Sequence, residues 1–192
     1  MTYTLFPHQE RGAAFLTSEP GTKGLFFGMG TGKTVTALEA LKRVKASRCV
    51  IIAPPIALPM WKAEAEAYLV QPAKILKTGA TELAGPERIV IASYAIAAKR
   101  SAELREWLNK DLSVLICDES HALKSVKAKR TKTILGSWGI AQGADYAWML
   151  TGTPITRWND DVYPFLCNAD LKGMRETIGG ISEEKFQLRY TV

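Results

Sequence analysis

The sequence predicts an α/β fold in which a mostly parallel central sheet carries helices on both faces. Two observations predict it. Short apolar runs, typical of strands buried on both faces, alternate with stretches whose apolar residues recur at helical spacing. Right-handed crossovers between such strands would place the loops that follow them at one edge of the sheet, where ligands bind in this class of fold. At 192 residues, 47% of them hydrophobic, the chain can form one domain with a substantial core.

The expected elements alternate along the chain. Apolar runs predict strands at residues 25–27, 50–53, 74–76, 89–93, 114–117 and 147–150. Apolar residues at helical spacing predict helices within residues 35–44, 58–68 and 104–108. Residues 78–87 and 139–145 have the composition of loops, and neither segment is long enough to link two domains.

A glycine loop (residues 28–34) follows the first expected strand and opens the first expected helix. Glycines at such a place let backbone N–H groups surround phosphate oxygens, and the helix turns its positive N-terminal end toward the same anion. Lys33 would reach the β and γ phosphates of ATP, and the Thr34 hydroxyl would hold Mg²⁺. The residues expected to bind the nucleotide here are Gly28, Met29, Gly30, Thr31, Gly32, Lys33 and Thr34.

The glycine loop departs from the usual P-loop pattern at one position. The pattern has a glycine where this sequence has Phe27, so Gly28 and Gly30 would supply the flexibility. A glycine-rich turn that merely joins a buried strand to a helix is the alternative interpretation. The succession of glycine, lysine and threonine directly after a strand disfavours it.

An acidic box (residues 118–121) ends the fifth expected strand. Its first two residues would stand at the same edge of the sheet as the glycine loop. Asp118 would bind Mg²⁺ through water, and Glu119 would orient and deprotonate the water that attacks the γ phosphate. The alternative is that residues 118–120 only cap the helix that follows, a common role for aspartate and serine, and the glycine loop upstream disfavours it.

Together these stretches resemble the first ATPase lobe of superfamily 2 helicase-like proteins, most of all the Swi/Snf-type double-stranded DNA translocases. The resemblance covers nearly the whole chain, implies a RecA-like P-loop NTPase lobe, and assigns Lys33, Asp118 and Glu119 to catalysis. In that family a glutamine of the entry segment contacts adenine, a role that Gln9 would take. A surface glutamine near a helix start is the alternative. The acidic box is Asp-Glu-Ser-His here, where Asp-Glu-Ala-His is the commoner family form.

The resemblance also implies a nucleic-acid groove. Two groove segments (residues 50–55 and 89–94) resemble the family segments that line it. Trp61 follows the first of them, but its helical spacing with apolar neighbours makes a place in the core the expected one. The candidates for contacts with nucleic acid are Lys62, Ser93, Lys99 and Arg100.

A coupling segment (residues 151–154, Thr-Gly-Thr-Pro) resembles the family element that connects the nucleotide site to nucleic acid. The resemblance implies that Thr151 and Thr153 act there together with His121 of the acidic box. A core histidine with satisfied hydrogen bonds is an equally simple interpretation of His121.

The resemblance implies a partner that this sequence does not contain. In the family the ATP site lies between two lobes, and the second lobe contributes arginines that stabilise charge on the transferring phosphoryl group. Only 38 residues follow Pro154, too few for such a lobe. We therefore expect residues 1–192 to form a single domain, the first lobe, with the second lobe in a longer chain or supplied in trans. An arginine finger is worth about a thousandfold or more in rate, so hydrolysis by this chain alone should be poor.

Composition fits a soluble protein of the cell interior, cytoplasmic or nucleoid-associated. The net charge is +6, and a local excess of basic residues at 124–132 would attract phosphate backbones, although a solvated helix face explains it equally well. No apolar run reaches the length of a membrane span. The three cysteines, Cys49, Cys117 and Cys167, are widely spaced, which favours reduced side chains over a disulfide or a zinc site.

These inferences predict a nucleic-acid-dependent ATPase lobe that uses ATP and Mg²⁺ and acts on duplex DNA. A strand-separating DNA or RNA helicase is the alternative within the same class, because the choice of duplex DNA rests on the resemblance alone. From another class comes a nucleotide-switched module that binds DNA or a protein without turnover. The complete set of Lys33, Thr34, Asp118 and Glu119 disfavours that last alternative.

Overall fold

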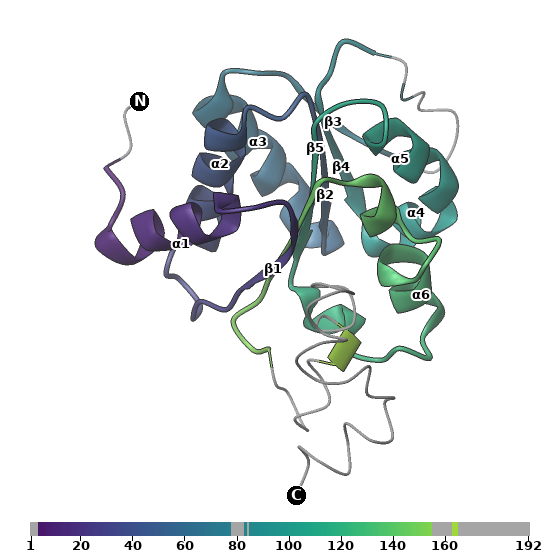
Figure 1. Cartoon of the computed structure of the whole chain (residues 1–192). Helices are drawn as coiled ribbons and strands as arrows, with labels where there is room; N and C mark the ends of the chain where they lie inside the picture. Colours follow the sequence, from purple (N-terminus) through teal and green to yellow (C-terminus); the bar gives the residue numbers. More distant parts are fainter. Residues whose placement is uncertain (1–3, 78–82, 84, 155–162, 165–192) are drawn as a thin grey trace, which may run out of the picture.

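The centre of the molecule is a six-stranded sheet in which every neighbouring pair is parallel (Figure 1). The computed structural model describes residues 4–77, 83, 85–154 and 163–164. The strand order is β1-β6-β5-β2-β4-β3, and the predicted α/β class is confirmed. The strands are β1 (Gly21–Leu25), β2 (Arg48–Ala53), β3 (Ala73–Ile75), β4 (Ile89–Ser93), β5 (Ser113–Asp118) and β6 (Tyr146–Leu150).

Helices cover both faces of the sheet, as predicted. On one face lie α1 (Pro7–Thr17), α2 (Lys33–Val44) and α3 (Leu58–Leu69), and on the other α4 (Tyr94–Lys99), α5 (Ser101–Leu108) and α6 (Lys129–Leu135). Successive strand residues serve opposite faces: Ile51 packs with the first set and Ile52 with the second. Three 3₁₀ helices complete the described elements: η1 (Pro55–Ala57), η2 (Ser120–Leu123) and η3 (Ile140–Gly143).

The first strand lies earlier than the sequence predicts. Residues 25–27 were the expected strand, but β1 ends at Leu25, which pairs with Leu150 at the end of β6. Phe26 and Phe27 already belong to the connection toward α2. An edge strand need not be apolar, so the polar β1 gives little periodic signal. Lys23, for example, is buried, and its ammonium group donates hydrogen bonds to the Phe15 carbonyl and the Ser18 hydroxyl.

The other expected strands agree with the structure within one or two residues. The expected loop at 139–145 instead contains η3, which packs against α5. The approach is close: a Cβ atom on Gly143 would lie 2.3 Å from the Arg105 carbonyl oxygen, so backbone meets backbone there. Of the expected loop at 78–87, residues 78–82 and 84 lie outside the described residues, as does Cys167.

The strand order arranges the motifs in a row along the carboxyl edge. The glycine loop follows β1, the coupling segment follows β6, and the acidic box begins at the last residue of β5. The two groove segments run into this edge along the next two strands, β2 and β4. The nucleotide half of the edge and the expected nucleic-acid half therefore meet at β5.

Candidate nucleotide site

The glycine loop closes around the side chain of its own lysine. Gly30 and Gly32 have φ angles of 73° and 83°, in the left-handed region that favours glycine. Lys33 begins α2, and its Nζ donates to the carbonyl oxygens of Phe27 and Gly28, each at 3.1 Å. The Thr31 hydroxyl donates to the same Gly28 carbonyl at 2.7 Å. The loop thus gathers a cation and the N-terminus of a helix at one place, an arrangement suited to phosphate.

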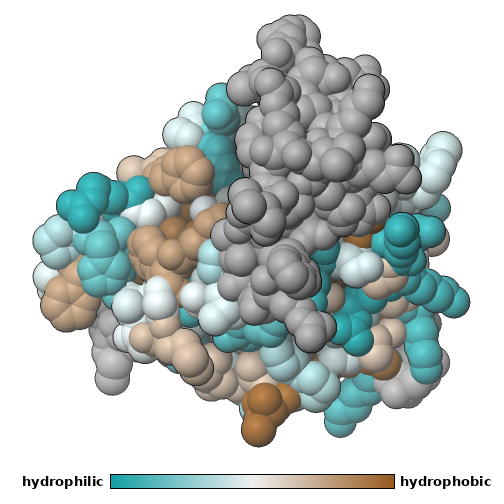
Figure 2. Space-filling view, turned by 90° about the horizontal axis from the view of Figure 1, so that it is seen from below, coloured by the Kyte–Doolittle hydropathy of each residue, from teal (hydrophilic) through white to brown (hydrophobic). Residues whose placement is uncertain are grey.

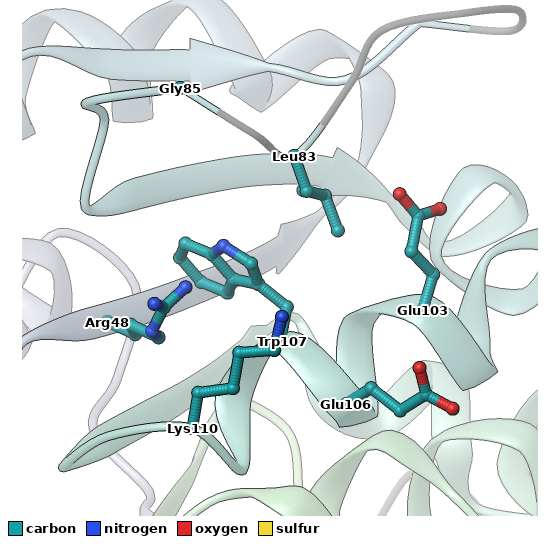
Figure 3. A pocket seen from close by; sticks show the side chains of 7 residues that line it. All are labelled: Arg48, Leu83, Gly85, Glu103, Glu106, Trp107 and Lys110. Carbon is teal, nitrogen blue, oxygen red and sulfur yellow. The ribbon is translucent and has the colours of Figure 1, made fainter.

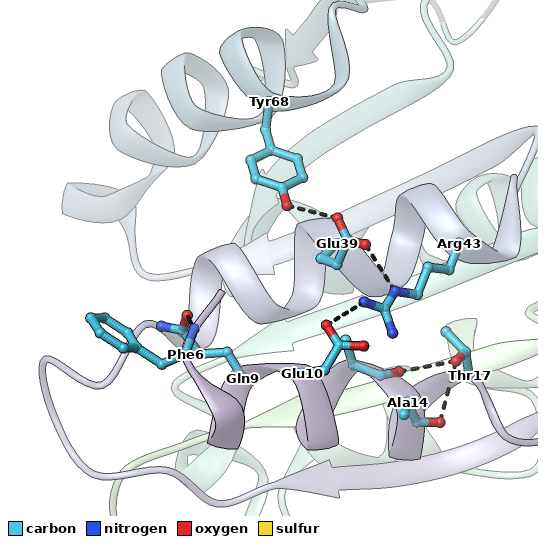
Figure 4. Close-up of polar contacts among 9 residues, drawn as sticks. Phe6, Gln9, Glu10, Ala14, Thr17, Glu39, Arg43 and Tyr68 are labelled. Atoms are coloured by element: carbon cyan, nitrogen blue, oxygen red, sulfur yellow. Dashed lines mark hydrogen bonds and ion pairs between the residues drawn. The ribbon is translucent and has the colours of Figure 1, made fainter. Parts of the chain in front are cut away.

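The start of α1 lies against the glycine loop. Gln9 is buried, and its Oε1 accepts from the Phe6 backbone N–H at 2.9 Å (Figure 4). Its Nε2 donates to the Thr31 carbonyl at 3.2 Å. The His8 Nε2 lies 3.0 Å from the same Thr31 oxygen. The structure therefore brings Gln9 to the loop rather than leaving it on the open surface. Sequence analysis missed His8, whose position directly before Gln9 was the available signal.

An ionic network holds α1, α2 and α3 together behind the glycine loop (Figure 4). Arg43 of α2 bonds Glu10 of α1 at 2.7 Å and Glu39 at 2.8 Å, and the Tyr68 hydroxyl of α3 donates to Glu39 at 2.7 Å. Burial opposes ionisation of Glu39, but the bonds from Arg43 and Tyr68 outweigh it and leave the Glu39 pKa lowered. The network was not anticipated from the sequence, because its members lie on three helices.

The acidic box is held by side chains from elsewhere in the sheet. Asp118 is 9% exposed, and its carboxylate accepts two hydrogen bonds, at Oδ1 from the Glu119 backbone N–H at 3.0 Å and at Oδ2 from the Trp61 indole N–H at 2.8 Å. The Tyr94 hydroxyl donates to the Asp118 carbonyl oxygen at 2.6 Å. Burial raises the pKa of Tyr94 well above its usual value, so the phenol remains a neutral donor. Trp61 is fully buried, as predicted.

Glu119 and His121 lead from the acidic box to the coupling segment. Glu119 adopts a left-handed backbone with a φ of 48°, and its Oε2 lies 3.1 Å from the His121 Nδ1. The same His121 nitrogen lies 3.2 Å from the Thr151 hydroxyl, which also accepts the Thr153 backbone N–H at 3.1 Å. The structure thus brings together the residues expected to couple, with the Thr153 backbone in contact. Neither Asp118 nor Glu119 caps η2 through its side chain.

The donor set fits magnesium and phosphate. Each Asp118 oxygen accepts one hydrogen bond and keeps a further lone pair. Within the described residues no ion pair engages Asp118 or Lys33, and no hydrogen bond engages the Thr34 hydroxyl. Oxygen ligands of this kind, completed by waters, are what Mg²⁺ prefers. The fourth residue of the box, Ser120, is fully buried and its hydroxyl has no partner in this part of the chain.

The candidates for nucleic-acid contacts differ in whether their side chains already have partners within the described protein. Lys62 pairs with Glu66, and Arg100 pairs with Glu103 through two nitrogens. Ser93 caps α4 by accepting the Ile96 N–H at 3.3 Å. Lys99 is exposed at the last residue of α4, with no ion pair among the described residues. Among the three basic candidates, Lys99 is therefore the one whose charge is unpaired within the described residues.

Large hydrophobic side chains are exposed at the carboxyl edge, as they are in several other places on the surface, such as Val70 and Trp138. Seen from this edge, hydrophobic residues lie among hydrophilic ones (Figure 2). The exposed large hydrophobic residues in the segments that follow β1 and β2 are Phe26, Met29, Ile56 and Met60. No helix in the described part of the chain is long and apolar enough to cross a membrane.

A separate hollow of about 460 Å³ lies at the opposite end of the sheet (Figure 3). Arg48, the first residue of β2, places its guanidinium 4.8 Å from the centre of the Trp107 ring there. Arg48 is also bound to Asp111 at 2.8 Å. None of the residues predicted to bind nucleotide or nucleic acid lines this hollow, so it forms no part of the candidate site.

Comparisons with known proteins identify the same family as the sequence motifs. The sequence model of the SNF2-related domain matches residues 8–169. The DNA annealing helicase and endonuclease ZRANB3 of Mus musculus is 31% identical over 158 residues, which cover 78% of this chain and 14% of that protein. A second relative, from Caenorhabditis elegans, is the SWI/SNF-related matrix-associated actin-dependent regulator of chromatin subfamily A-like protein 1 homolog. It is 29% identical over 153 residues, which cover 78% of this chain and 22% of that protein.

Solved structures share the fold. The Sulfolobus solfataricus SWI2/SNF2 ATPase core in complex with dsDNA superposes with a TM-score of 0.77 at 19% identity, covering 97% of this chain and 39% of that one. The ATPase core domain from the same organism gives the same TM-score at 20% identity. The chain therefore spans between 14% and 22% of the length of these two curated relatives and 39% of the solved core.

Proposed function

The chain belongs to the SNF2-related domain family, and from this membership we propose that it is the nucleotide-binding lobe of an ATP-driven motor that acts on duplex DNA. The observation that carries the proposal is the strand order β1-β6-β5, because it sets the glycine loop, the coupling segment and the acidic box side by side. Parallel sheets of this kind bind ligands at that edge. Membership also confirms the family resemblance that the sequence predicts.

The glycine loop and Gln9 would bind the nucleotide. Within the described residues the Lys33 ammonium has only neutral carbonyl partners, and charged phosphate oxygens would form stronger bonds with it. The Gln9 amide, fixed beside Thr31, would contact the adenine edge. Thr34 and Asp118 would hold Mg²⁺, which when bound neutralises charge on the β and γ phosphates.

Glu119 would take the proton of the attacking water. Its side chain is 35% exposed, so water can reach the carboxylate, while His121 holds one of its oxygens. Because His121 also contacts Thr151, a shift of the coupling segment would change the position of the general base. This contact offers a route by which nucleic acid could control hydrolysis.

Duplex DNA would lie along the groove segments that follow β2 and β4. Lys99 is the leading candidate for a phosphate contact because its charge is free of ion pairs in the described part of the chain. Lys62 and Arg100 would exchange their glutamate partners for phosphate oxygens. Such contacts make affinity fall as salt rises.

The residues 1–192 would act as the first lobe, with a second lobe closing over the carboxyl edge. The exposed Met29 and Ile56 at that edge support a protein partner there, since large apolar side chains in one region mark interaction sites. Closure of this kind completes catalytic sites that are open in one domain. The arginines of the second lobe would then supply the missing transition-state stabilisation.

Phosphate release with duplex DNA, single-stranded DNA, RNA or no nucleic acid tests the proposal, with nucleotide binding measured in the same samples. We expect the chain to bind ATP and turn it over slowly, with duplex DNA the best activator once a second lobe is supplied. Lys33→Ala should abolish both binding and turnover. Better stimulation by single strands or RNA would favour the strand-separating helicase. Binding without turnover, even with the second lobe, would favour the nucleotide-switched module.

A further inference from the structure

One buried hydrogen bond crosses from the groove side of the sheet to the nucleotide side. Trp61 lies in α3, the helix that follows the first groove segment, and its indole N–H donates to the Asp118 Oδ2 at 2.8 Å. The two residues are 57 positions apart in the chain. Because Asp118 ends β5 and α3 follows the neighbouring strand β2, the bond joins the two halves of the carboxyl edge.

The bond fixes the direction of the Asp118 carboxylate. One oxygen is held by Trp61 and the other by the Glu119 backbone N–H, so the plane of the carboxylate cannot rotate without losing one of them. The indole is fully buried, and a donor that meets an ionised oxygen away from water forms a strong bond. Tyr94, at the end of the second groove segment, holds the main chain of the same residue.

We propose that Trp61 is a positioning residue for magnesium: its indole N–H holds the Asp118 carboxylate in the orientation that receives the water shell of the ion. The inference rests on the proposed function, because it takes Asp118 as the magnesium-binding carboxylate. Partners that orient a metal-binding group typically change metal affinity when removed. A purely structural tryptophan would need only the ring and not the N–H group.

The molecule contains a matched control for this proposal. Trp148 of β6 is also fully buried and belongs to the same hydrophobic cluster as Trp61, but its indole N–H has no hydrogen-bond partner among the described residues. Trp61→Phe and Trp148→Phe therefore remove similar volumes from one core. Only the first also removes a hydrogen bond to Asp118.

The test measures binding of Mn²⁺, a substitute for Mg²⁺, to the chain with ADP kept below the protein concentration, because ADP left free in solution would itself chelate the metal. The readout is the electron paramagnetic resonance signal of free Mn²⁺. We expect Trp61→Phe to weaken Mn²⁺ binding about tenfold, and Trp148→Phe to leave it unchanged. Affinity for ADP without metal should be the same in all three proteins. Benzothienylalanine at position 61 replaces the N–H by sulfur in a ring of nearly equal shape, and should reproduce the loss of Mn²⁺ affinity.

The benzothienylalanine protein keeps the test decisive if Trp61→Phe does not fold. Wild-type Mn²⁺ affinity in that protein would overturn the inference and leave Trp61 as core packing. An equal loss in Trp148→Phe would overturn it as well, because the loss would then follow core volume. If the wild-type chain binds ADP but no Mn²⁺, Asp118 is not a magnesium site and the inference fails. If the wild-type chain binds no nucleotide at all, the proposed function fails first.

Discussion

The glycine loop and the acidic box face the same edge of the sheet but are supported in opposite ways. Residues 28–30 of the loop are exposed and residues 31–34 are half-buried, and the side chains of Lys33 and Thr31 bond carbonyls only a few residues away. The acidic box begins with a buried carboxylate that Trp61 and Tyr94 hold from 57 and 24 residues away. The side chains of the loop thus find their partners in local sequence, and α1 adds a contact to its Thr31 carbonyl through Gln9, whereas the carboxylate at the end of a buried strand is held by side chains from other elements.

Replacing Gly32 by alanine should have the largest effect on the loop side of this comparison. The Gly32 φ of 83° costs an alanine about 1–2 kcal/mol. Its new Cβ would also stand 2.2 Å from the Gln9 Nε2, which would have to leave the Thr31 carbonyl. We expect ADP affinity, measured by fluorescence titration, to fall on the order of tenfold or more, since each 1.4 kcal/mol is a factor of ten.

Gly28→Ala is the control in the same loop. Its φ is not in the left-handed region, and an added Cβ would meet only the Thr31 methyl group at 3.8 Å, an ordinary contact. ADP affinity should stay near that of the wild type. Equal losses in the two variants would mean that the loop tolerates no side chain anywhere, and that backbone conformation is not what selects Gly32.

The sequence predicts the glycine loop well because its signals are local. Gly-Lys-Thr before an amphipathic helix gives the loop, the start of α2 and the place of Lys33 from neighbouring residues alone. It predicts β1 poorly, because an edge strand with two glycines and a lysine lacks the apolar run by which the other strands are found. The predicted strand therefore lies too late in the sequence, whereas the predicted glycine loop lies where the structure has it.

Tyr94→Phe tests the hydrogen bond that holds the main chain of the acidic box. We expect an effect on the free energy of unfolding that lies between those of the other variants. The variant removes the hydroxyl that donates to the Asp118 carbonyl at 2.6 Å in a buried setting. Leaving a buried acceptor with one donor fewer costs about 1.5 kcal/mol, which chemical denaturation should detect. Tyr146→Phe is the control, because no hydrogen bond engages the Tyr146 hydroxyl in the described part of the chain. A similar loss of stability in both variants would contradict the role given to the Tyr94 hydroxyl.

The support of the acidic box is the part that the sequence could not reveal. Helical spacing predicts that Trp61 is buried, and it is, but spacing carries no information on what its N–H meets. The partner lies on another strand, and the order of β2 and β5 in the sheet had to be known first. The contact of His121 with Thr151 shows the other case, since the family resemblance named both residues and the fold brings them together.

Changes in the ionic network of Glu10, Glu39, Arg43 and Tyr68 should have the smallest effect on the free energy of unfolding, and this effect should depend on pH. The Glu39 pKa is lowered in the folded protein, so ionised Glu39 contributes stability above its unfolded pKa of about 4.3, and loses it as pH falls through the folded pKa. Glu39→Gln should cost about 1 kcal/mol at pH 7, measured by denaturation. The difference from the wild type should shrink as the pH falls below about 4.

Glu10→Gln, at the exposed end of the same network, should change stability less, because solvent screens its bond to Arg43. The free energies of unfolding of Glu39→Gln and the wild type could instead differ by the same amount at acid and neutral pH. That result would show that Glu39 stabilises the packing of α1 and α3 through its shape and not through its charge.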